Sequence, residues 1–94
     1  MTLKAILDLR LLPRRCALFY VRANVRALRL GDRFSLRAAL PPKELSVLVG
    51  LAQGRKTVVE LGTGTGWTAL VLALAEPERI VRTYDTQVRP HRAA

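Results

Sequence analysis

The apolar positions of the sequence follow a helical spacing in the first half of the chain and a strand–helix–strand pattern after residue 56. Pro13 suits the first turn of a helix that runs to about Leu30, and Gly31 is a typical stop signal. Pro41 and Pro42 introduce a second helix, whose apolar positions have helical spacing: Leu45, Leu48, Val49 and Ala52. Residues 1–56 are therefore predicted to form an N-terminal helical region.

The remainder of the chain predicts one βαβ unit. The run Thr57-Val58-Val59-Glu60-Leu61 is rich in β-branched and apolar residues, which is typical of a strand buried in a parallel sheet. Residues 67–75 are mainly leucine and alanine and suit a buried helix, and residues 79–85 form a second predicted strand. Residues 57–94 are therefore expected to be the first strand–helix–strand unit of an α/β cofactor-binding domain, truncated soon after its second strand.

The charge of the chain is positive and unevenly spread. Its 16 basic and 7 acidic residues give a net charge of +9, and residues 1–37, with nine basic and two acidic residues, account for +7 of it. Five arginines, here called the arginine stripe, share an arc of roughly 60° on and just past the first helix: Arg15, Arg22, Arg26, Arg29 and Arg33. The opposite arc carries apolar side chains: Ala17, Tyr20, Val21 and Leu28. Because no exposed aromatic residues interleave the arginines, a solvated or protein-covered face is favoured over a nucleic-acid contact.

Cysteine content and hydropathy exclude several classes of protein. The single cysteine, Cys16, excludes an intramolecular disulfide and a cysteine-based zinc site within this chain, and it is expected to be a small core residue. The longest uncharged run, residues 61–75, is shorter than the roughly 20 apolar residues that a spanning helix needs. We therefore expect no transmembrane segment, no metal site and, without a signal-peptide pattern, a cytoplasmic location.

The strongest candidate for a ligand site is Gly62-Thr63-Gly64-Thr65-Gly66, here called the glycine loop, between the first predicted strand and the next helix. Glycines allow a ligand close to the backbone, and the helix start adds N–H groups and partial positive charge. No lysine follows as in a P-loop, which argues against triphosphate binding. The dinucleotide fingerprint would need glycine or alanine where Trp67 stands, but a shifted match, Gly64, Gly66 and Ala69, keeps an NAD-type site as an alternative.

Glu60 adds a negative charge at the carboxyl end of the first strand, where doubly wound sheets bind their ligands. Two unit charges 4 Å apart at an effective dielectric near 20 interact by about 4 kcal/mol. Glu60 would therefore repel a pyrophosphate and attract a cation. A cofactor with an ammonium and a sulfonium group fits this site better than NAD.

Residues 58–68 resemble the first motif of class I S-adenosylmethionine-dependent methyltransferases, Glu/Asp-x-Gly-x-Gly-x-Gly after the first strand. Asp85, at the end of the second strand, matches the second acidic position of that family, which binds the ribose hydroxyls. The resemblance implies that the glycine loop cradles the methionine part of S-adenosyl-L-methionine and that Glu60 lies near its amino group. Trp67 is also a candidate contact, although packing at the helix start is its favoured role. The candidate cofactor-binding residues are Glu60, Gly62, Thr63, Gly64, Thr65, Gly66, Trp67 and Asp85.

The resemblance spans residues 57–85 and implies a partial doubly wound, Rossmann-like methyltransferase fold. Complete family members have a seven-stranded sheet, whose fourth strand and following loop supply much of the acceptor and catalytic surface. Only two strands are predicted here, so we expect the cofactor-loop portion of a methyltransferase with no catalytic base of its own, whose sheet a further segment or another chain completes. The alternatives are a non-enzymatic basic helical module that binds nucleic acid or anionic surfaces, and an NAD-type dinucleotide-binding fragment.

Overall fold

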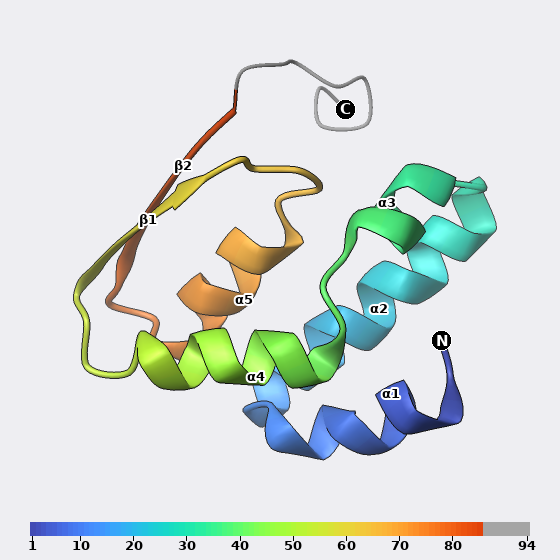
Figure 1. The fold of residues 1–94 in the computed structure, drawn as a ribbon, viewed down its shortest axis with the longest axis horizontal. Coiled ribbons are helices and arrows are strands. Elements are labelled where there is room, and N and C mark those ends of the chain that lie inside the picture. Colours follow the sequence, from blue (N-terminus) through green and yellow to red (C-terminus); the bar gives the residue numbers. More distant parts are fainter. Residues whose placement is uncertain (86–94) are drawn as a thin grey trace.

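Five α-helices and a two-stranded parallel sheet make up the described part of the chain, residues 1–85 of the computed structural model (Figure 1). Their bounds are α1 Leu3–Asp8, a 3-10 helix Leu9–Leu11, α2 Arg14–Leu30, α3 Arg33–Ala38, α4 Pro42–Leu51, β1 Thr57–Leu61, α5 Trp67–Ala75 and β2 Ile80–Tyr84. The predicted α/β class is confirmed. Within residues 1–85 no helix has the length and apolar character that crossing a membrane requires.

Helix α2 begins and ends where the sequence predicts. Pro13 precedes its first residue, and Gly31 ends it with a left-handed φ of 67°. The N–H of Gly31 then bonds to the Leu28 carbonyl and the N–H of Asp32 to the Ala27 carbonyl, the pair of bonds of a Schellman motif. All members of the arginine stripe are exposed, which fits both a solvated face and a binding face.

The buried face of α2 is narrower than the apolar arc predicts. Cys16, Tyr20 and Ala27 are buried, whereas Val21 and Leu28 of the predicted arc are exposed. Residues four and seven positions apart lie on one narrow face of a helix, and the flanking Ala17 and Phe19 are only partly buried against the core. The periodicity identified the helix, but the arrangement of its neighbours decides which apolar residues are buried.

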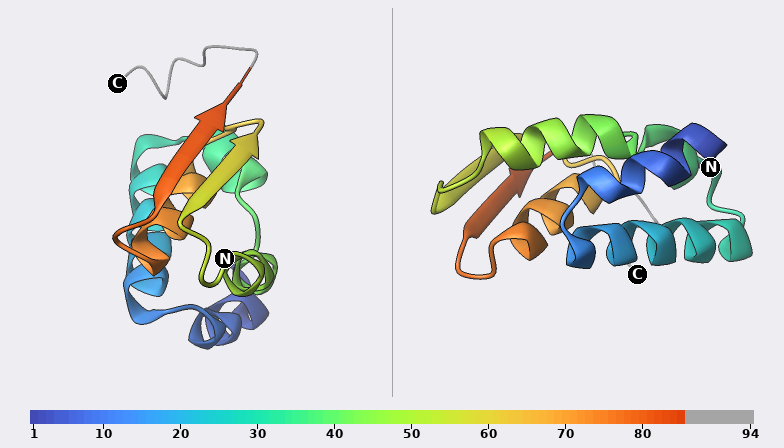
Figure 2. Two further views of the ribbon diagram at one scale, coloured as in Figure 1. Left: turned by 90° about the vertical axis from the view of Figure 1, so that its left-hand side faces the viewer. Right: turned by 90° about the horizontal axis from the view of Figure 1, so that it is seen from below.

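The two strands pair in parallel, with Thr57 opposite Ile80 and Leu61 opposite Tyr84. Helix α5 covers the face that carries Val58 and Glu60, and both of these residues are partly buried. In the left view of Figure 2 the strands lie in front of the helices, and no described helix covers their near side. The large apolar residues on that side are exposed: Val59, Leu61, Ile80 and Tyr84. The predicted parallel pairing is therefore confirmed, but among the described residues the expected burial of β1 holds on one face only.

One hydrophobic core joins the helical region to the βαβ unit. Its buried members are Leu12, Cys16, Tyr20, Leu45 and Val71. The predicted core role of Cys16 is confirmed: its thiol donates to the carbonyl of Val71 at 3.3 Å, and burial raises its pKa, which makes the thiol unreactive. The Tyr20 hydroxyl donates to the Leu40 carbonyl at 3.0 Å. The core therefore fixes α2 against α4 and α5, the helix that follows the glycine loop.

A buried arginine holds the base of the βαβ unit together. Arg79 directly precedes β2, and its side chain is fully buried. Its guanidinium donates to the backbone carbonyls of Arg55 and Leu72, each at 2.9 Å, and to that of Ala52. Arg79 also forms an ion pair of 3.2 Å with Glu76. These contacts tie the end of α4, the approach to β1 and helix α5 to one side chain.

Candidate functional site

The glycine loop connects β1 to α5 at the carboxyl end of the sheet, as predicted. Gly62, Gly64 and Gly66 have φ angles of +87°, +57° and +84°, a region that costs other residues about 1–2 kcal/mol. A Cβ atom added to any of the three would meet no atom within 4 Å. The loop therefore needs its glycines for its backbone conformation, and it leaves open space where a ligand can approach the backbone.

Short-range hydrogen bonds fix the shape of the loop. The N–H of Gly62 donates to the carbonyl of Tyr84 at 2.6 Å and extends the strand pairing by one residue. The N–H of Gly66 donates to the carbonyl of Thr63 at 2.9 Å, and the hydroxyl of Thr65 accepts from the N–H of Trp67 at 3.1 Å. These bonds within the protein hold the loop in one shape, which reduces the entropy that ligand binding would cost.

Glu60 begins a chain of hydrogen bonds that reaches the loop. The hydroxyl of Thr83, directly opposite Glu60 in β2, donates to its Oε1 at 2.9 Å. The hydroxyls of Thr83 and Thr63 lie 2.7 Å apart. Because a hydroxyl has a single proton to donate, Thr63 must be the donor to Thr83. The Glu60 carboxylate is thereby linked to the base of the glycine loop.

The pKa of the Glu60 carboxyl depends on its partly buried position in β1. Burial raises the pKa of its carboxyl above the ordinary value of 4.5, and the hydrogen bond from Thr83 opposes part of that rise. A raised pKa means that the negative charge is under-compensated by the surrounding protein. A cation bound beside Glu60 would supply the missing compensation.

The raised pKa of Glu60 predicts that the stability of the fold depends on pH. A carboxyl whose pKa is higher in the folded than in the unfolded chain weakens the fold when both states are ionised, and this penalty disappears as the pH falls through the folded pKa. Glu60→Gln keeps an acceptor for Thr83 without the charge. We expect it to raise the melting temperature at neutral pH, with the gain shrinking toward pH 4.5. Thermal unfolding of both chains across this pH range tests this, and a constant difference would contradict it.

Asp85 closes the loop from the side of β2. Its Oδ2 accepts a hydrogen bond of 3.2 Å from the N–H of Gly64, and the side chain is partly buried. The two acidic residues singled out in the sequence therefore both reach the glycine loop, Glu60 through Thr83 and Thr63, and Asp85 directly.

Trp67 lies where the loop enters α5 and packs into the protein. Its ring meets that of Tyr20 edge to face, with centroids 6.1 Å apart and planes at 79°, and it packs against the hydrophobic core. The favoured packing role of Trp67 is therefore confirmed. Through Tyr20, the indole also connects the glycine loop to α2.

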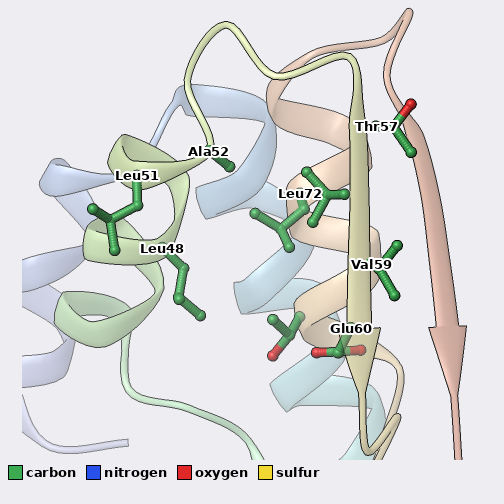
Figure 3. A pocket seen from close by; sticks show the side chains of 9 residues that line it. Leu48, Leu51, Ala52, Thr57, Val59, Glu60 and Leu72 are labelled. Carbon is green, nitrogen blue, oxygen red and sulfur yellow. The ribbon is translucent and has the colours of Figure 1, made fainter.

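A second feature beside Glu60 is an apolar pocket of about 350 Å³ along β1. Figure 3 shows Leu48 of α4 and Leu72 of α5 facing the space between these helices, with Glu60 near the carboxyl end of β1. No residue of the glycine loop lines this pocket. Its mainly apolar walls suit further packing against β1 and not a charged cofactor.

Thr83 is a site residue that the sequence analysis missed. Once the two strands are paired, the alternation of faces places Thr83 beside Glu60, so the pattern of β2 together with its register was the available signal. Within residues 1–85 no cluster of three metal-ligating side chains exists.

Comparisons of the chain with protein-family models, with curated proteins and with solved structures found no match. The functional assignment therefore depends on the geometry of the glycine loop and its two acidic residues.

Proposed function

We propose that this chain binds S-adenosyl-L-methionine at the glycine loop and is the cofactor-binding portion of a methyltransferase with a Rossmann-like, doubly wound fold. One observation carries the proposal. Glu60 and Asp85, from the ends of two parallel strands, both connect to a loop whose three glycines have positive φ. Ligands of doubly wound sheets bind at this end of the strands.

The residues present fit such a cofactor. The open space over Gly62, Gly64 and Gly66 admits a ligand to the backbone, and the under-compensated charge of Glu60 favours a ligand with an ammonium group. Asp85, whose Oδ2 accepts from the N–H of Gly64, stands at the position where the methyltransferases that this chain resembles bind the ribose hydroxyls of the cofactor.

In methyl transfer, the main role of the protein is to bind and orient the two reactants. When bound, the cofactor supplies an electrophilic methyl group: a lone pair of the acceptor forms the bond to its carbon, the carbon–sulfur electron pair stays on sulfur, and the acceptor's proton goes to solvent. The residues of this chain hold the reactants in line and exclude water, which is the main contribution that proximity makes to such a reaction. None of them is assigned a proton-transfer step.

Calorimetric titration of the chain with S-adenosylmethionine, S-adenosylhomocysteine and NAD tests the proposal. We expect the first two ligands to bind, and NAD to bind at least about tenfold more weakly because Glu60 repels its pyrophosphate. Glu60→Gln should lower the affinity for S-adenosylmethionine roughly tenfold or more, because it removes a charge-assisted hydrogen bond to the ligand. Glu78→Gln, the same change at an exposed position just before β2, is the matched control.

The alternatives make different predictions in this experiment. Tighter binding of NAD would favour the dinucleotide site of the shifted glycine pattern. If the chain shows a folded circular dichroism spectrum and binds none of the three ligands, the cofactor proposal is wrong. Equal weakening by Glu60→Gln and Glu78→Gln would show that overall charge, and not the loop, controls binding.

A further inference from the structure

A groove of about 560 Å³ lies between α2, the start of α3 and the segment where the glycine loop enters α5. Sites for small molecules have volumes of about 300–1,000 Å³. Its walls are mainly apolar, and the large side chains among them are Phe19, Leu30, Trp67 and Leu70. Arg22 and Arg26, two exposed members of the arginine stripe, also line the groove. The groove thus combines an apolar interior with a cationic wall.

The described residues that line this groove carry two positive charges and one negative charge. Arg22 and Arg26 lie four residues apart on α2, a spacing at which like charges repel. Asp32 also lines the groove, but its carboxylate caps α3: it accepts from the N–H of Ser35 at 3.0 Å and from its hydroxyl at 2.6 Å. The groove thus has two arginine side chains and one carboxylate that bonds to the start of α3, and this excess of positive charge among its described residues favours an anionic ligand.

The groove adjoins the proposed cofactor site. Thr65 and Trp67 line the groove, and Thr65 belongs to the glycine loop, while Trp67 follows it directly. The bond from the Trp67 N–H to the Thr65 hydroxyl orients both residues. A molecule held in the groove would therefore lie next to a molecule held by the loop.

We propose that this groove binds the methyl acceptor and that the acceptor is an amphipathic anion. Its carboxylate or phosphate group binds Arg22 and Arg26, since guanidinium groups form strong paired hydrogen bonds with such oxygens. Its apolar body packs against Trp67 and Leu70 and displaces water from the walls. The role as acceptor rests on the proposed function, whereas the anion site itself does not.

Trp67 is the single tryptophan of the chain, so its fluorescence reports directly on the groove. Four probes are titrated without cofactor: octyl phosphate, octanoate, the neutral octanamide and inorganic phosphate. We expect octyl phosphate and octanoate to shift the emission of Trp67. Octanamide lacks the charge and inorganic phosphate lacks the apolar body, so each should bind at least about tenfold more weakly than octyl phosphate.

Paired substitutions separate the groove from the general charge of the stripe. The double variant Arg22→Gln with Arg26→Gln should lower the affinity for octyl phosphate about tenfold or more. Arg15→Gln combined with Arg29→Gln removes the same charge from α2 at positions that do not line the groove, and it should leave the affinity within about twofold. Equal weakening by both pairs, or octanamide binding as tight as that of octyl phosphate, would overturn the proposal. Binding to phosphatidylglycerol vesicles without binding of soluble octyl phosphate would overturn it too, in favour of a membrane surface.

The acceptor role is tested separately from the cofactor site. Gly64→Val should weaken S-adenosylmethionine binding roughly a hundredfold or more and leave octyl phosphate binding unchanged, because Gly64 does not line the groove. If S-adenosylmethionine binds and octyl phosphate does not, the cofactor proposal stands and the acceptor groove is wrong. If octyl phosphate binds and S-adenosylmethionine does not, the acceptor role is wrong and the groove is an anion site of another function.

Discussion

Arg79→Met is expected to destabilise the chain by roughly 3–5 kcal/mol, as the removal of one partner from a buried, charged network does. The guanidinium donates to three backbone carbonyls from separate segments and is fully buried. Methionine fills similar space but leaves those carbonyls without their donor. Since domains of this size are stable by only about 5–15 kcal/mol, the loss removes much of the total stability. Urea unfolding followed by circular dichroism measures it.

Two further variants separate the hydrogen bonds of Arg79 from its ion pair. Arg79→Lys keeps the charge but cannot reach three carbonyls from a single ammonium group, so we expect a smaller loss than in Arg79→Met. Glu76→Gln removes the charge of the ion-pair partner but keeps an oxygen that can accept from the N–H of Gly54. Because the Glu76 side chain is 36% exposed, this change should cost about 1 kcal/mol or less. Equal losses in Arg79→Met and Glu76→Gln would contradict the assignment, because the ion pair would then account for the whole effect.

Local sequence signals were sufficient to predict the bounds of several helices and strands. The bounds of β1 and α5 agree with the prediction, because glycines and a change of residue type mark both boundaries within a few positions. Helix α2 also has local signals at both ends, Pro13 and Gly31. Element bounds depend on neighbours along the chain, and such neighbours are visible in the sequence.

Contacts between distant segments were not predictable in the same way. The sequence predicts Arg79 as the first residue of a strand, whereas β2 begins at Ile80. The role of Arg79 depends on three carbonyls that only the folded chain brings together. Val21 and Leu28 have the right periodicity for a core but lie on a part of α2 that no neighbour covers. The link from Glu60 through Thr83 requires the register of the two strands.

The candidate site was predictable only in part, because it combines a local motif with contacts between distant segments. The glycine loop and Glu60 were recognisable as a local motif, and the structure adds the positive φ angles that make glycine necessary there. Asp85 was a candidate by its resemblance to a ribose-binding position, and its bond to the N–H of Gly64 is visible only in the folded chain. Arg22 and Arg26 were seen as two members of a uniform stripe, and only the packing of α2 against α5 sets them apart from the others.

Gly64→Val is expected to weaken S-adenosylmethionine binding roughly a hundredfold or more, equivalent to about 2.8 kcal/mol. Two effects add. A β-branched residue is strained at a φ of +57°, and its side chain occupies the open space through which a ligand reaches the loop backbone. Calorimetric titration measures the affinity, and circular dichroism shows how much of the chain remains folded.

A matched variant separates strain from obstruction of the site. Gly54 also has a positive φ, +78°, with no atom within 4 Å of an added Cβ, but it precedes β1 at the end of the sheet opposite to the loop. Gly54→Val should therefore lower stability about as much as Gly64→Val, by roughly 1–2 kcal/mol, and leave cofactor affinity unchanged. If both variants lose affinity in proportion to stability, binding depends on global folding and the loop is not the site. Gly64→Ala, with less strain and a smaller side chain, should show an intermediate loss of affinity in a chain that stays folded, so the comparison remains decisive even if the valine variants unfold.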